Sequence, residues 1–184
     1  MISLFEINPA IDRARLAREF ATNGRVQIRD VLTNDAARNL RHVLMNQTQW
    51  GLSWQAGEEG GPNSLRAQEI AAMPAHQKAE FARTISDAMR GNDYGFVFSH
   101  YPMLNAYLEQ WDEGSPHDIL LEHLNSEPFL SLVRDITGIP ELIKADGQAT
   151  LFAPGQFLAQ HNDSHVAEGW RVAYVLNMSP DEWR

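Results

Sequence analysis

The sequence contains no cysteine, which excludes disulfides, thiolate metal sites and a cysteine nucleophile. Basic residues are few: 15 Lys and Arg stand against 24 Asp and Glu, for a formal net charge of −9. A surface of this sign repels phosphate groups, so neither nucleic acid nor a membrane is expected as a partner. No apolar run approaches the roughly 18 residues that span a bilayer, and the first residues lack the pattern of a signal peptide. We therefore expect a cytoplasmic protein, whose metal ligands, if any, are His, Asp or Glu.

The composition is that of a globular protein. Of the 184 residues, 43% are hydrophobic and 21% are charged, which excludes collagen-like, coiled-coil and disordered classes. The length favours one domain with a substantial core. The hydrophobic pattern changes near residue 140, from helical periodicity over 1–140 to alternation over 141–184. We therefore predict an α+β fold, with 1–184 forming a single domain.

Helix boundaries are indicated by capping residues around apolar stripes. Pro9 follows Asn8, a favourable N-cap, and Gly138 directly follows a clean apolar face. The predicted helices span 8–24, 33–47, 74–91 and 126–138.

Short alternating segments predict strands. Val26 and Ile28 lie on one face of the first such segment, and Pro154-Gly155 forms a turn signal between two later ones. Strands at this spacing favour an antiparallel sandwich or barrel over βαβ units. The predicted strands span 24–31, 148–152, 157–163 and 170–178.

Two segments are compatible with more than one structure. The segment 50–68 has two Trp residues before a Gly-rich acidic turn, which fits either a hairpin or a mobile lid. The segment 92–118 is rich in aromatic residues, which either line a pocket or pack against the helices. Both alternatives remain open at this point for each segment.

His161 and Asp163 are the residues with the clearest chemical potential. Residues two apart in a strand project from the same face, so this imidazole and carboxylate would point together. With a second His they would complete the two-His-one-carboxylate triad that binds Fe(II) and leaves positions open. The tripeptide alone favours a solvated loop after a strand, and the surrounding sequence shifts the balance toward a ligand pair.

The surrounding sequence resembles the prolyl-4-hydroxylase-like branch of the Fe(II)- and 2-oxoglutarate-dependent oxygenases. That family has a Tyr-x-x-Gly-x-Phe-Leu-x-x-His-x-Asp run, followed by an Arg, a strand and a Trp. The resemblance covers most of the chain, and its specific part is 148–184. The residues in register are Gly155, Phe157, Leu158, His161, Asp163, Arg171 and Trp183.

The resemblance implies a fold, a ligand set and cofactors. The fold would be a double-stranded β-helix (a jelly roll, cupin-like) buttressed by N-terminal helices. His161 and Asp163 would be the first two metal ligands. Phe152 stands where the family has Tyr and would form a cosubstrate pocket wall, and Asn177 would contact 2-oxoglutarate. The cofactors would be Fe(II), 2-oxoglutarate and O2, with ascorbate as an optional addition, in a dioxygenase that hydroxylates a C–H bond.

The family's distal His and the basic residue that anchors 2-oxoglutarate should follow Trp183 by several tens of residues. The nearest other imidazole, His165, is not expected to be a ligand. One interpretation is that the sequence lacks the C-terminal strands of a longer enzyme. The alternatives are a non-catalytic β-helix module for binding or assembly, and a cupin-like metal protein with other chemistry. The substrate would be a prolyl residue or a small molecule, and an uncovered edge strand would also allow a homodimer.

Overall fold

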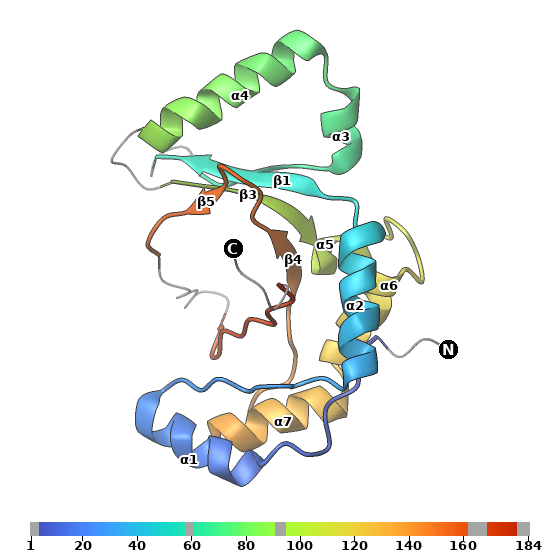
Figure 1. The fold of residues 1–184 in the computed structure, drawn as a ribbon, viewed down its shortest axis with the longest axis vertical. Helices are drawn as coiled ribbons and strands as arrows, with labels where there is room; N and C mark the ends of the chain where they lie inside the picture. The colour runs from blue at the N-terminus through green and yellow to red at the C-terminus, as the bar shows by residue number, and fades with distance from the viewer. Residues whose placement is uncertain (1–3, 58–60, 91–94, 162–168, 180–184) are drawn as a thin grey trace. The chain divides into compact units, whose positions relative to one another are not determined.

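The computed structural model describes residues 4–57, 61–90, 95–161 and 169–179 (Figure 1). These residues form seven α-helices and an open antiparallel sheet of five strands, which confirms the predicted α+β class. None of the helices in this part of the chain is both long and apolar enough to cross a bilayer. The chain divides into two compact units. One comprises 1–47, 103–147 and 167–184, and the other comprises 48–102 and 148–166.

The first unit is helical. Its core is the contact between α1 and α7, where Leu16 packs with Leu132 and Ile136, all nearly inaccessible to solvent. The same two helices are joined at the surface by an ion pair between Arg13 and Asp135, with 2.7 Å between nitrogen and oxygen. The helices of this unit are α1 (Arg13–Asn23), α2 (Asn34–Asn46), α5 (Met103–Leu108), α6 (Pro116–Leu124) and α7 (Glu127–Thr137).

Most predicted helix ends in this unit are confirmed, and one is wrong. Thr33 precedes α2. Ser126 precedes α7 and Gly138 follows it, with the left-handed φ of 70° that favours glycine. The first helix begins after Asp12, whose carboxylate accepts the Arg15 N–H at 2.9 Å, and not at Asn8. The Asn8 side chain instead accepts the Ala10 N–H and forms a local turn, a known alternative for Asn.

The second unit contains the sheet. The strands are β1 (Gly51–Ala56), β2 (Asn63–Leu65), β3 (Gly95–Pro102), β4 (Gln148–Leu151) and β5 (Phe157–Leu158), in the order β2-β1-β3-β4 with β5 also paired to β3. Two helices, α3 (Ala67–Ala72) and α4 (Ala75–Arg90), lie along one side of it (Figure 1). The Phe81 ring meets the Trp54 ring edge-on, 4.7 Å apart, and so joins α4 to β1. The segment 50–68 is thus a hairpin, the first of the two structures considered for it.

Three predicted strands are absent or shorter in the structure. Residues 25–28 and 170–178 contain no strand, although both alternate in sequence. Of the predicted strand 157–163, only β5 forms; Asp163 lies outside the described residues. The aromatic-rich segment 92–118 contains β3, the central strand, which sequence periodicity missed. Alternation of polar and apolar residues identifies a segment that is able to form a strand. A strand forms only where another segment of the chain provides backbone hydrogen bonds to it.

Candidate functional site

The candidate site lies on the edge of the sheet formed by β4 and β5. Both strands run antiparallel to β3, one after the other: Leu151 pairs with Ser99, and Leu158 pairs with Phe96. Between these two pairs the edge segment runs from residue 151 to residue 158, whereas β3 runs only from residue 96 to residue 99. The surplus residues, 152–156, bulge out of the sheet as the turn that Pro154-Gly155 predicted, with Gly155 at a left-handed φ of 84°.

The side chain of Gln156 holds this turn to β3. Its Oε1 accepts the backbone N–H of Ser99 at 3.1 Å and that of Ala153 at 2.9 Å. Its Nε2 donates to the Ser99 hydroxyl at 3.1 Å. The Gln156 amide thus supplies an acceptor where the hydrogen-bond ladder between β3 and the edge strands is interrupted. This bond fixes the register of β5 on β3 after β4 has ended.

His161 follows β5 by three residues. The strand is extended by one further bond, from the Ala159 N–H to the Gly95 carbonyl at 3.1 Å. The Nδ1 of His161 lies 3.0 Å from the Ala159 carbonyl oxygen, and the side chain is exposed. A carbonyl only accepts, so the neutral imidazole carries its proton on Nδ1 and its lone pair on Nε2. Metal-binding histidines are commonly oriented by such a backbone contact.

Asp163 and His165 both lie outside the described residues. Within the ranges that the structure describes, no group of three His, Asp or Glu side chains could hold a metal ion.

Phe152 lies at the start of the bulge and is 50% exposed. Its ring is 5.6 Å from that of Phe98, which in turn stacks on Phe96 at 5.2 Å. These rings form an aromatic face on β3. His100 continues the same face, with its ring 6.0 Å from that of Phe98.

Two residues of this neighbourhood were not singled out from the sequence. Burial lowers the pKa of His100, and a hydrogen bond that the His100 ring donates to the Gln148 side chain partly opposes this effect. Gln156 had no sequence signal, because a glutamine in a turn is ordinarily a solvated residue. The position of His100 in an aromatic run was the available signal for a partly buried imidazole.

Asn177, the proposed cosubstrate contact, belongs to the other compact unit. Its Oδ1 accepts the Ser179 N–H at 2.9 Å, which forms a local turn. The segment before it is held by Tyr174, whose hydroxyl donates to the Asp146 carbonyl at 2.6 Å and whose ring lies 5.3 Å from Phe129. This docking replaces the strand that the alternation of 170–178 predicted.

Neither a protein-family model, nor a curated protein, nor a solved structure matches this sequence.

Proposed function

We propose that this chain carries the first two iron ligands, His161 and Asp163, of an Fe(II)- and 2-oxoglutarate-dependent dioxygenase of the prolyl-4-hydroxylase-like family. The observation that carries the proposal is the hydrogen-bonded His161 ring. Its Nδ1 faces the Ala159 carbonyl, and its Nε2 is the lone-pair nitrogen of an exposed imidazole at the end of a strand. Histidines that bind metals commonly donate their other ring N–H to a backbone carbonyl in this way.

The donor types of the segment fit Fe(II). An imidazole nitrogen and a carboxylate two residues apart supply two of the three ligands of a facial triad. Bound iron and 2-oxoglutarate would together supply the O2 chemistry that hydroxylates an unactivated C–H bond. The oxidation itself would therefore need no redox-active side chain of the protein.

The protein's own contribution is positioning. The Gln156 amide fixes the bulge and β5, so the His161 backbone is held within three residues of a paired strand. Phe152 on the edge segment and Phe98 on the adjoining strand β3 form an apolar wall, which would exclude water from a reacting C–H bond. Asn177 would contact 2-oxoglutarate.

The proposal extends to the fold and the cellular context. The strands β3, β4 and β5 would be the beginning of a double-stranded β-helix, with further strands completing it. The substrate would be a prolyl residue or a small molecule. We further propose a cytoplasmic location, ascorbate as an optional reductant, no nucleic-acid or membrane partner, and an open sheet edge that permits a homodimer.

The test is 2-oxoglutarate turnover to succinate by the full-length protein with Fe(II). His161→Ala and Asp163→Ala should each abolish it, because either loss leaves an incomplete ligand set. His76→Ala, an exposed histidine on α4, is the matched control and should retain turnover. Retained consumption in both ligand variants contradicts the proposal. Metal binding without 2-oxoglutarate dependence would favour a cupin-like protein, and no metal binding would favour the non-catalytic module.

A further inference from the structure

Two steps of the chain place a glycine directly after Asn or Asp: Asn23-Gly24 and Asp146-Gly147. A glycine has no Cβ to shield its own peptide nitrogen, so the preceding side chain can approach that nitrogen closely. A bond from the nitrogen to the side-chain Cγ closes a five-membered succinimide ring, which water reopens on either side. Both steps are therefore candidates for spontaneous backbone isomerisation, and the conformation of each decides whether it reacts.

The Asp146 carboxyl group is folded back onto the peptide bond that follows it. Asp146 is exposed and lies outside any helix or strand, between α7 and β4. The Gly147 N–H donates to the Asp146 Oδ1 at 2.6 Å and has no other partner among the described residues. Because Cγ is bonded directly to Oδ1, the nitrogen and the carbon that must join are held close together.

Hydrogen bonds hold the backbone on the N-terminal side of this step. The Asn125 side chain bonds to both backbone groups of Ala145, accepting its N–H at 2.9 Å and donating to its carbonyl at 2.8 Å. The Asp146 carbonyl accepts the Tyr174 hydroxyl at 2.6 Å. The backbone is thus anchored, and the reaction needs only a rotation of the carboxyl group toward the nitrogen.

Packing favours a glycine after Asp146. A Cβ at position 147 would lie 2.7 Å from the Met103 Cε and 3.3 Å from the Leu124 Cδ1. Both of these side chains are buried, so a larger residue at 147 would have to displace them. The packing of the helical unit therefore favours the residue that makes this step reactive.

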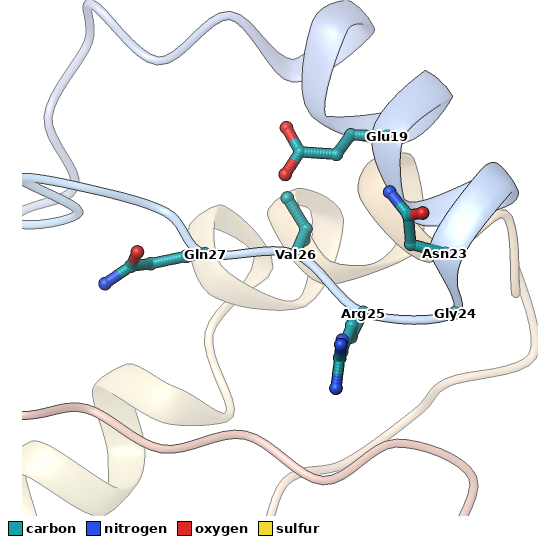
Figure 2. Close-up of a pocket in the computed structure, with 6 residues that line it drawn as sticks. All are labelled: Glu19, Asn23, Gly24, Arg25, Val26 and Gln27. Carbon is teal, nitrogen blue, oxygen red and sulfur yellow. The ribbon is translucent and has the colours of Figure 1, made fainter.

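The Asn23-Gly24 step is protected by its conformation, although both residues are exposed. Asn23 is the last residue of α1, and both residues line an open hollow beside that helix (Figure 2). Side chains on a helix lean toward its N-terminus, away from the peptide bond that follows. The Gly24 N–H also donates to the Phe20 carbonyl at 2.8 Å. Attack on Asn23 would therefore require the last turn of α1 to open first.

We propose that Asp146 isomerises spontaneously to isoaspartate in the folded protein and that Asn23 is protected. The Gly147 nitrogen bonds to the Asp146 Cγ and loses its proton, while one carboxyl oxygen leaves as water. A second water then opens the ring. Cleavage at Cγ restores aspartate, and cleavage at the Asp146 backbone carbonyl carbon gives isoaspartate. The mass is unchanged, and neither an oxidant nor a cofactor takes part.

The consequence falls on the segment that Tyr174 holds. In isoaspartate the chain runs through the former side chain, so the backbone is one methylene longer. The former Asp146 carbonyl, which accepts the Tyr174 hydroxyl, becomes a free carboxylate. Isomerisation should therefore loosen the docking of residues 170–178. This modification is independent of the proposed metal chemistry.

The test is to incubate the protein, folded or unfolded in urea, at neutral pH and physiological temperature. Peptide mapping with electron-transfer dissociation distinguishes isoaspartate from aspartate at each position. In the unfolded protein Asn23 should react first, because ammonia leaves an amide more readily than water leaves a carboxylate. In the folded protein the order should reverse. Product at Asp146 should exceed product at Asn23 at least about tenfold, since misplaced reacting atoms cost that much or more.

Two variants locate the reaction. Asp146→Glu should show no isomerisation at this position, because attack would close a less favourable six-membered ring. Asp35→Glu, at an exposed aspartate of α2, is the matched control and should isomerise at Asp146 as the parent does. The isomerised fraction of the parent should exchange its amides faster over 170–178, whereas incubated Asp146→Glu should not.

Three results would overturn the proposal: no isoaspartate at Asp146 in the folded protein, Asn23 reacting ahead of Asp146 there, or unchanged amide exchange over 170–178 in the isomerised fraction. Because the two steps are compared within one protein, the first two results do not depend on the folding of any variant.

Discussion

The side chain of Gln156 accepts a hydrogen bond from the Ser99 N–H at a point where the edge strand is interrupted and its backbone offers no acceptor. The Ser99 N–H, in the central strand, donates to the Gln156 Oε1 at 3.1 Å, and the Gln156 Nε2 returns a bond to the Ser99 hydroxyl at 3.1 Å. One side chain therefore links the bulge 152–156 to β3 and sets where β5 begins. The proposed ligand His161 depends on this link for its position.

Gln156→Ala should destabilise the protein by about 1–3 kcal/mol, because it leaves the partly buried Ser99 and Ala153 N–H groups without their acceptor. Chemical denaturation measures the free energy of unfolding. Gln77→Ala on the exposed face of α4 is the control and should change it by less than about 0.5 kcal/mol. Equal effects of the two variants would refute the role assigned to Gln156.

The tautomer of His161 is a second expectation. With Nδ1 facing the Ala159 carbonyl, the neutral ring should carry its proton on Nδ1, the less common tautomer of free histidine. Long-range ¹H–¹⁵N NMR of the metal-free protein at alkaline pH reports which nitrogen is protonated. A proton found on Nε2 would mean that the lone pair points at the carbonyl, and the ligand geometry would then be wrong.

Tyr174→Phe removes the hydroxyl that donates to the Asp146 carbonyl and keeps the ring on Phe129. The expected loss is about 0.5–1.5 kcal/mol of unfolding free energy. Tyr107→Phe is the control, since the Tyr107 hydroxyl contacts Glu122 at the surface, and it should cost less. Faster amide exchange over 170–178 in the Tyr174 variant alone would locate the effect. No difference between the variants would contradict the docking of this segment.

The Tyr174 hydroxyl should also lose its proton at a higher pH than an ordinary tyrosine. Although 39% of the residue is exposed, burial of the hydroxyl end and the nearby Asp146 charge raise its pKa to about 12. A pKa raised on folding stabilises the protein fully below the ordinary value of 10, and this contribution is lost as the pH rises through 12. The stability difference between the parent and Tyr174→Phe should therefore shrink over that interval.

Two histidines should make the fold acid-sensitive. Burial lowers the pKa of His100 and of His117; the latter is 4% exposed, and Asp118 and Asp112 partly oppose the shift. Their neutral forms are favoured by folding, so stability is full above the unfolded pKa of 6.5 and falls as the pH drops below it. The variant His100→Gln/His117→Gln should have a shallower pH dependence than His76→Gln. Identical slopes would disprove this assignment.

The helical part of the fold was the easier part to predict. Capping residues act within one turn, so Ser126 and Gly138 identify α7 from the sequence alone. Strands depend on distant partners. The alternation of 24–31 and of 170–178 matches the partly buried side chains of Val26, Ile28, Val172 and Leu176, whereas Tyr174 is exposed. Neither segment forms a strand in the structure. The central strand β3 was missed because its aromatic residues fit a pocket as well as a sheet.

The candidate site was predictable to a similar extent. The turn at Pro154-Gly155 and the strand before it follow from local chemistry, and both are present. The hydrogen bonds of Gln156 could not be predicted, because they depend on Ser99, far away in the sequence. The His161 ring orientation likewise depends on the chain conformation after β5.

The central claim is that His161 and Asp163 hold a divalent metal. It is tested most directly by titrating the metal-free protein with Mn²⁺, a substitute for Fe(II), and measuring free Mn²⁺ by electron paramagnetic resonance. The account predicts saturable binding in the parent and in His76→Ala. It predicts binding weakened at least about tenfold, or about 1.4 kcal/mol, in His161→Ala and Asp163→Ala. Equal affinity in all four proteins, or no binding by the parent, would contradict it.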